Sequence, residues 1–191
     1  MSFLKSVSSQ ALDFLETIIL AFVIFILIDN FVVQPHIVKG NSMLPNFHTS
    51  ERIFTQKITY YFKPPERSDI IVFKYPLAPD REYIKRIIGL PGEELQIETG
   101  KVKVFNKEHP EGFLLKEAYL TTGMVTEPKN IIGVTAKFKV PEDNYVVMGD
   151  NRPESSDSRE WGAVPRKNII GKVFLRYWPP SKLSLIVHAV Y

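Results

Sequence analysis

The chain contains no cysteine among its 191 residues. This absence excludes a thiol nucleophile, a thiolate metal site, a redox motif and a disulfide scaffold. Histidine is also scarce, and none of the four residues has a second histidine three to five positions away; they are His36, His48, His109 and His188. A histidine-based metal site therefore has little support, and we expect neither a metal nor another cofactor.

The chain also lacks a large excess of positive or negative charge. The formal net charge is only +3, which is too small to indicate a nucleic-acid partner, and we expect none. The sequence has no glycine-rich loop of the kind that cradles phosphates, no internal repeat and no low-complexity tract. The length suits one domain, or one domain with a sub-domain, and is sufficient to bury a core.

What the sequence does contain is one strongly apolar segment, residues 11–33, of which 18 in 23 are apolar. Its uninterrupted run, 18–28, spans only about 17 Å as a helix, but with its flanks the segment reaches membrane-spanning length. We therefore predict a transmembrane anchor at 11–33 after a short tail at 1–10. A cleaved signal peptide is the first alternative, although small residues do not follow the apolar run; a buried soluble helix is the second.

The charges around this segment predict an orientation. The tail before Asp13 carries Lys5 and no acid, and the next basic residue after the anchor is Lys39. The tendency of basic residues to stay inside favours a cytoplasmic N-terminus and an extracytoplasmic body. Residues 1–35 carry a net −2 and the remainder a net +5, so the body is also expected to approach an anionic bilayer.

After the stop at Gln34–Pro35, β-strand patterns dominate the body. Alternating apolar residues on either side of Thr99–Gly100 predict a hairpin. The predicted strands are Ile70–Phe73, Tyr83–Ile88, Leu95–Ile97, Val102–Val104, Tyr145–Met148 and Ile169–Leu175. We therefore expect an all-β body of mixed antiparallel sheets with one N-terminal helix.

Residues 106–142 differ from the rest of the body. They contain scattered proline and glycine, and only weak strand patterns at Ile131–Thr135 and Ala136–Val140. We predict a small inserted β sub-domain here, between the two halves, 34–105 and 143–191, of one catalytic β core.

Three segments are rich in groups capable of chemistry. In Gly40–Pro45, Ser42 precedes a proline turn and could be an exposed nucleophile, or an ordinary turn serine. In Tyr83–Gly92, alternation places Lys85 and Arg86 on opposite faces of a largely apolar strand, so one cation must face apolar neighbours. A lysine desolvated in this way has a lowered pKa and can deprotonate a serine; the alternative is a lysine at a sheet edge.

The third segment, Gly149–Gly162, is dense in hydrogen-bonding side chains between apolar strands. It predicts either a long surface loop or a loop that folds over an active site and orients a catalytic group. A Ser-His-Asp triad stays open on spacing alone, although none of the four histidines lies in these three segments.

Taken in order, these segments resemble the bacterial type I signal peptidases. Gly40–Pro45 resembles the family's nucleophile box, Tyr83–Gly92 its lysine box, and Gly149–Gly162 its last box, and the preceding apolar segment also fits. The resemblance covers the anchor and most of residues 36–178. It implies a signal-peptidase-like fold and a membrane-anchored serine endopeptidase that removes signal peptides from secreted preproteins.

The resemblance also implies roles for individual residues. Ser42 would be the nucleophile and Lys85 the general base, while Ser155 would orient the Lys85 amine. Asp157 and Arg159 would pair and hold the loop. The Ser42 N–H would donate to the oxyanion, but Gly40 stands where some members carry a second, hydroxyl donor.

The substrate would be a preprotein bound as an extended strand and cut after a small-x-small site. Large aliphatic walls would restrict its pockets to small side chains. By resemblance, the residues lining the pockets are Val38, Met43, Ile53, Val72, Tyr83 and Ile84. Proximity to the translocation channel is a further expectation.

Two rival readings remain. The body could be a non-catalytic, membrane-anchored module that binds extended peptides, or a relative of the self-cleaving Ser/Lys repressors. The first rival would be expected to have lost Ser42, Lys85 or Ser155, yet all three are present. The second would need a DNA-binding domain, for which the predicted anchor leaves no room.

Overall fold

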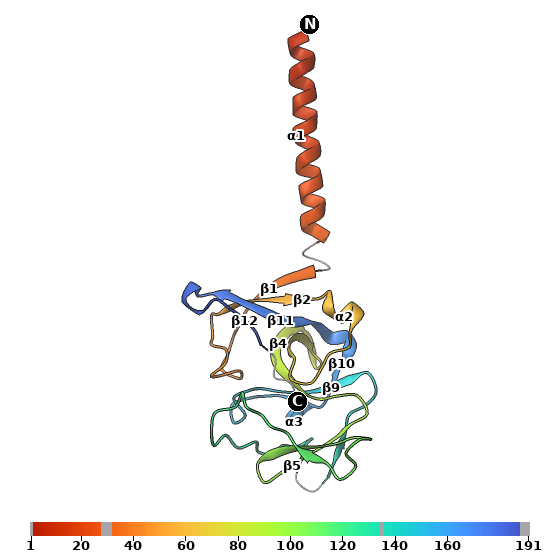
Figure 1. Ribbon diagram of the computed structural model, residues 1–191, viewed down its shortest axis with the longest axis vertical. Helices are drawn as coiled ribbons and strands as arrows, with labels where there is room; N and C mark the ends of the chain where they lie inside the picture. Colours follow the sequence, from red (N-terminus) through yellow and green to blue (C-terminus); the bar gives the residue numbers. More distant parts are fainter. Residues whose placement is uncertain (1, 28–31, 134–135, 188–191) are drawn as a thin grey trace.

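The computed structural model describes residues 2–27, 32–133 and 136–187 of the chain. Its first element is helix α1, Ser2–Leu27, which projects away from the β-rich body (Figure 1). The side chains of residues 13–26 are all exposed. Within the described residues, no helix is at once long and apolar enough to cross a membrane. The anchor predicted at 11–33 includes residues 28–31, which lie outside the described residues, and it stays a prediction.

The body is built on a large antiparallel sheet, which has eight strands in the part of the chain that the structure describes. Its main path runs β1-β2-β11-β3-β4-β9-β10, and β12 pairs with β11. The strands are β1 (Val33–Ile37), β2 (Arg52–Gln56), β3 (Ile70–Tyr75), β4 (Ala78–Gly89), β9 (Asn144–Met148), β10 (Val164–Pro165), β11 (Ile169–Trp178) and β12 (Ser184–Leu185).

A second sheet lies at the end of the body farther from α1 (Figure 1). Its four described strands run in the order β7-β6-β5-β8: Phe113–Leu114, Lys101–Phe105, Glu94–Glu98 and Phe138–Lys139. The predicted hairpin is confirmed, and its turn residues Thr99 and Gly100 both have positive φ. The segment 106–142 therefore supplies β7 and β8, and its strands join a hairpin that precedes it.

Short helical turns connect these strands. They are α2 (Thr59–Phe62), α3 (Ser158–Trp161), and the 3-10 turns η2 (Arg166–Asn168) and η3 (Pro180–Lys182). We expected one N-terminal helix, and the structure adds two short helices of one turn each, α2 and α3. Sequence periodicity could not indicate them, because one turn is too short to show a repeat. The Asp157 side chain caps α3 by accepting from the Arg159 N–H.

The predicted strand at Ile131–Thr135 is wrong for residues 131–133, which form no strand, and residues 134–135 lie outside the described residues. Ile132 is nevertheless fully buried in the core of the second sheet. Its apolar character therefore reflects burial of a loop rather than a place in a strand, and periodicity over so few residues does not separate the two.

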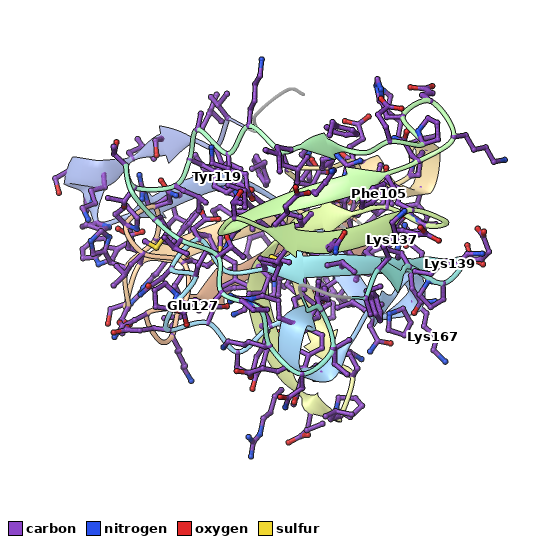
Figure 2. The ribbon with its side chains drawn as sticks, turned by 90° about the horizontal axis from the view of Figure 1, so that it is seen from below. Phe105, Tyr119, Glu127, Lys137, Lys139 and Lys167 are labelled. Atoms are coloured by element: carbon purple, nitrogen blue, oxygen red, sulfur yellow. The ribbon has the colours of Figure 1, made fainter. Side chains whose placement is uncertain are left out.

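Figure 2 shows the end of the body opposite α1, where the second sheet lies. Phe105 and Lys137 are neighbours here, with the Lys137 amine 3.6 Å from the centre of the Phe105 ring. Beneath this surface, Leu95 and Val104 are cross-strand partners that are fully buried. The second sheet therefore has an apolar core of its own, continuous with Ile88 and Val146 of the first.

Truncating this core should destabilise the protein. Leu95→Ala removes a fully buried side chain and should lower the free energy of unfolding by about 2–5 kcal/mol. Leu77→Ala, at a side chain that is 70% exposed, should change it by roughly 0.5 kcal/mol or less. Urea unfolding measures both, and equal costs for the two variants would contradict the assignment of Leu95 to the core.

Candidate active site

Strand β4 carries Lys85 into the interior, where only 4% of the residue is exposed. Its cross-strand partner on β3 is the fully buried Ile71. The Lys85 amine donates hydrogen bonds to Ser42 Oγ at 2.7 Å and to the Ile84 carbonyl at 3.2 Å. The structure thus brings together two residues 43 positions apart, at the distance proton transfer requires.

Burial strongly affects the charge of this amine. Desolvation lowers the pKa of Lys85 to about 8, against the weaker attraction of Asp157 and Asp150, which acts to raise it. With a pKa of about 8, about a tenth of the amines are neutral at pH 7, far more than for an ordinary lysine. The neutral amine has a lone pair that can accept the Ser42 hydroxyl proton.

The loop containing Ser42 is fixed by the segment that follows β9. The Asn151 N–H donates to the Ser42 carbonyl at 3.0 Å, and the Asn151 side chain donates to the Asn41 carbonyl at 3.1 Å. Gly149 makes a similarly close approach, because a Cβ there would overlap the Ser42 carbonyl oxygen and Ser155 Oγ. Glycine is therefore required at 149 for space rather than for backbone conformation.

Arg86 faces away from Ser42, on the other side of β4. Its guanidinium makes two hydrogen bonds to the Asp150 carboxylate, at 2.8 and 2.7 Å, and both residues are buried. It also lies over the Tyr119 ring, 3.8 Å from the ring centre. The two adjacent cations of β4 therefore have different environments, since Arg86 has a buried counter-charge and Lys85 has a serine.

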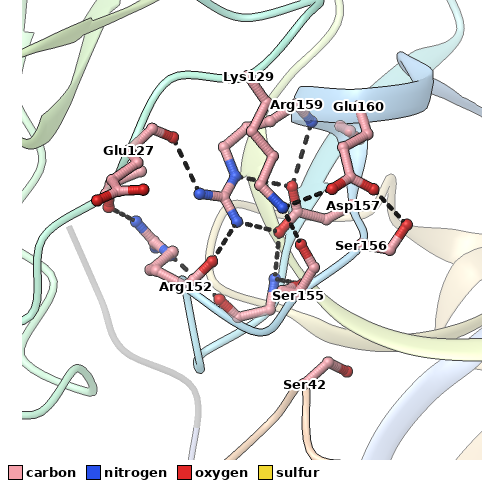
Figure 3. A network of polar contacts seen from close by, with 12 residues as sticks. Ser42, Glu127, Lys129, Arg152, Ser155, Ser156, Asp157, Arg159 and Glu160 are labelled. Atoms are coloured by element: carbon pink, nitrogen blue, oxygen red, sulfur yellow. Dashed lines mark hydrogen bonds and ion pairs between the residues drawn. The ribbon is translucent and has the colours of Figure 1, made fainter.

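Asp157 and Arg159 form a second buried pair, drawn in Figure 3. Two bonds of 2.8 Å join them, and Asp157 also accepts from the Gly149 N–H at 3.2 Å. Burial by itself would raise the pKa of Asp157, but the hydrogen bonds and charge of Arg159 outweigh it and the pKa is lowered. The carboxylate therefore stays ionised and fixes the loop between β9 and α3.

The segment 106–142 contacts the loop between β9 and α3 on the side away from Ser42 (Figure 3). Lys129 donates to the Ser155 carbonyl at 2.8 Å and pairs with Glu160 at 2.5 Å. The Ile131 N–H donates to the Arg159 carbonyl at 2.8 Å, and Arg152 pairs with Glu117. The loop is thus held between the first sheet and the segment 106–142.

A cleft of about 840 Å³ leads to the Ser42–Lys85 pair. It runs between the segments that contain β1 and the first half of β4. Its inner walls are apolar, and the lining residues that the sequence predicted are Val38, Ile53, Val72, Tyr83 and Ile84. Met43, which was also predicted, is not among the described residues that line the cleft. Its side chain is fully buried in the core next to it.

Ser155 also lies near the site but bonds elsewhere. Its Oγ accepts from the Gly149 N–H at 3.1 Å, and it is a hydrogen-bond partner of Asp157. Among the described residues, the hydrogen bonds of the Lys85 amine go to Ser42 and Ile84 instead. The orienting role of Ser155 at Lys85 stays a prediction.

Several residues of the site had no assigned role in the sequence. Asp150 and Arg152 lie in the polar segment Gly149–Gly162. The position of this segment between apolar strands was the one feature of the sequence that pointed to them. Their partners Arg86, Glu117 and Thr126 lie 26 to 64 positions away, so the pairs themselves could not be anticipated. Nothing in the sequence indicated that Lys129 lies at the site, because it is one of several lysines in a polar segment.

Comparison with known proteins agrees with this arrangement. The family profile described as "Signal peptidase, peptidase S26" matches residues 11–178. The chain belongs to the signal peptidase family. It is 38% identical over 183 residues to "Signal peptidase I" of Leptolyngbya laminosa, covering 92% of this chain and 84% of that one. It is 33% identical to "Signal peptidase I P" of Bacillus subtilis subsp. natto, covering 94% and 95%.

A crystal structure of a signal peptidase I from Enterococcus faecalis V583 is also similar. It has 30% sequence identity and a TM-score of 0.46, covering 58% of this chain and 97% of that chain. Signal peptidases of this family are serine endopeptidases, and this chain is one of them. The expected family is thereby confirmed, as is the expectation of a mostly β structure with antiparallel sheets.

The pKa of Lys85 predicts the pH dependence of activity. If the neutral amine is the active form, about a tenth of the enzyme is competent at pH 7 and about nine tenths at pH 9. kcat/KM for a preprotein should therefore rise about tenfold per pH unit well below pH 8 and level off above it. A rise with its midpoint near pH 10.4, the ordinary value for lysine, would contradict the buried amine.

Gly149→Ala should disturb the site through sterics alone. The added methyl group would overlap the Ser42 carbonyl, and a displacement of Ser42 by about 1 Å can lower kcat/KM by roughly 10²-fold if Ser42 takes part in catalysis. Gly133→Ala is the matched control, because nothing lies within 4 Å of a Cβ there. Comparable activity of the two variants would show that the space at Gly149 does not matter for the position of Ser42.

Proposed function

We propose that Ser42 is the nucleophile and Lys85 the general base with which this chain cleaves signal peptides from secretory preproteins. The observation that carries the proposal is the 2.7 Å contact between the Lys85 amine and Ser42 Oγ at the inner end of a cleft. The lowered pKa of the amine supports the same roles, because an ordinary protonated lysine could not act as a base.

The proton balance follows from this contact. The neutral Lys85 amine takes the Ser42 hydroxyl proton as Oγ bonds to the carbonyl carbon of the scissile peptide. The resulting ammonium gives that proton to the leaving amine as the C–N bond breaks, which leaves an acyl-enzyme on Ser42. Lys85 then takes a proton from water as the water oxygen bonds to the acyl carbon. The Lys85 ammonium gives that proton to Ser42 Oγ as the ester bond breaks.

The oxyanion formed in these steps requires hydrogen-bond donors, and we assign the Ser42 N–H as one of them. Gly40 has a φ of +86°, a conformation that other residues rarely adopt. Glycine supplies no side-chain hydroxyl here, and a serine or threonine at position 40 would have a strained backbone. The second donor in this chain must come from another group.

The apolar walls support selection of small residues at the first and third positions before the cleaved bond. Val38, Ile53 and Val72 are at most 3% exposed and line the cleft close to Ile84. Their side chains are packed in the core, so a bulky substrate residue would have to displace well-packed neighbours. Met43 and Tyr83 belong to the proposed first pocket, Met43 from within the core and Tyr83 at the surface of the cleft.

Asp157 and Arg159 act in this proposal by holding the loop that fixes Ser42, and Ser155 by orienting Lys85. The segment 106–142 is proposed as an inserted sub-domain of the core 34–105 and 143–191. Its contacts through Lys129 and Ile131 give it a supporting role at the loop, because they bond the carbonyls of Ser155 and Arg159.

We also propose that the protein is anchored in the cell membrane by residues 11–33, with residues 1–10 in the cytoplasm and the body outside. The apolar side chains of α1, such as Phe14, Phe22 and Phe25, support this placement, since each is at least 62% exposed. Signal peptides emerge at the outer membrane surface, which favours contact of the body with the lipid bilayer and proximity to the translocation channel.

Removing either member of the pair should abolish cleavage. Ser42→Ala and Lys85→Ala should each lower kcat/KM on a preprotein with an Ala-x-Ala site by roughly 10³-fold or more. Ser181→Ala and Lys101→Ala are matched controls at exposed positions and should retain full activity. Thermal unfolding confirms that each variant is folded, and near-normal activity of either site variant would refute the assignment.

A further inference from the structure

The apolar floor of the cleft gives way to a polar one farther from Ser42. On β1, side chains alternate, and His36 faces the cleft as Val38 does, while Ile37 between them is 55% exposed. On β4, Glu82 shares a face with Ile84 for the same reason. His36 and Glu82 are therefore the next pair along the floor, one step beyond Val38 and Ile84.

His36 and Glu82 join the two sides of the cleft. His36 Nδ1 lies 3.1 Å from Glu82 Oε2, a contact between β1 and β4, which are not neighbours in the sheet. His36 Nε2 lies 3.0 Å from Thr55 Oγ1 on β2, beneath the floor. The His36 side chain is only 8% exposed, whereas that of Glu82 is 40% exposed. The imidazole is thus fixed from both ends, and the carboxylate stays accessible from the cleft.

Glu82 is the partly exposed acid that faces this end of the cleft, and Lys57 is a cation close enough to act on His36. Burial lowers the pKa of His36 and outweighs the opposing effect of Glu82, so the imidazole is mainly neutral at pH 7. It therefore does not cancel the charge of Glu82. Asp80 and Arg81 are also at the rim, where both are exposed, and their opposite charges offset one another.

An extended substrate would meet this pair at a defined position. In a strand, every second side chain faces the same way, about 6.8 Å apart. A substrate whose first and third residues before the cleaved bond point to the apolar floor must also point its fifth residue there. The order along β1 from Ser42 is Val38 and then His36, so the fifth side chain lies over His36 and Glu82.

We propose that His36 and Glu82 form a polar subsite for the fifth substrate residue before the cleaved bond, and that it selects side chains that donate hydrogen bonds and rejects acidic ones. The inference rests on the proposed function and adds a selection rule to it. An ammonium or amide can donate to the Glu82 carboxylate, whereas an aliphatic side chain would desolvate that carboxylate without a partner. A carboxylate would be repelled by it.

The test uses the full chain and preproteins that share an Ala-x-Ala site and differ only in the fifth residue, which is Lys, Gln, Leu or Glu. kcat/KM should be highest for Lys and Gln, and roughly three- to tenfold lower for Glu, because Glu82 is partly solvated. Glu82→Gln should reduce the difference between Lys and Glu at least twofold. The control Glu98→Gln removes the same charge from a 49% exposed side chain of β5 and should leave the ratio unchanged.

The outcomes separate the two proposals. Equal rates across the four substrates, or a Lys-to-Glu ratio that Glu82→Gln does not reduce, would overturn the subsite while leaving the cleavage activity intact. An equal reduction in Glu98→Gln would also overturn it, since the effect would then come from net charge. If the wild-type chain cleaves none of the four preproteins, the proposed function fails, and the subsite fails with it.

Discussion

The burial of one lysine amine against one serine hydroxyl is the constraint on which the rest of the site depends. Desolvation favours the neutral amine, but the charges of Asp150 and Asp157 favour the ammonium. Each of these carboxylates makes a two-bond pair with an arginine, Arg86 and Arg159 respectively. Desolvation is the larger effect at Lys85, so the amine can act as a base. Buried ion pairs are weak evidence for stability, but here they also fix the loop that packs against Ser42.

Rigidity around Ser42 comes from parts of the chain that are distant in sequence. Asn151 bonds the backbone of the nucleophile loop, Gly149 permits the close approach, and Lys129 holds the same segment from the other side. The segment 106–142 therefore contributes to the site through the loop that holds Ser42. Backbone hydrogen bonds therefore position Ser42 in addition to the contact between its side chain and Lys85.

Much of this arrangement could be predicted from the sequence. Apolar runs located β3 and β9 closely, and alternation located β5 and β6. The apolar strand around Lys85 indicated a desolvated cation. The family resemblance then identified Ser42 as its partner. The buried pairs Arg86–Asp150 and Arg152–Glu117 could not be predicted, because polar residues far apart give no periodic signal. The loop at 131–133 was misread as a strand because Ile132 is buried. The contact between His36 and Glu82 could not be predicted either, because it depends on β1 and β4 lying on opposite sides of one cleft.

The most direct test of the central claim is the pKa of the Lys85 amine in the intact, uncomplexed protein. NMR titration of the lysine Cε resonances measures it, and Lys85→Ala assigns the signal by its disappearance. The account predicts a midpoint at about pH 8 for this one lysine. A midpoint near 10.4, the ordinary lysine value, would mean that the amine is protonated at working pH and would contradict its role as the base.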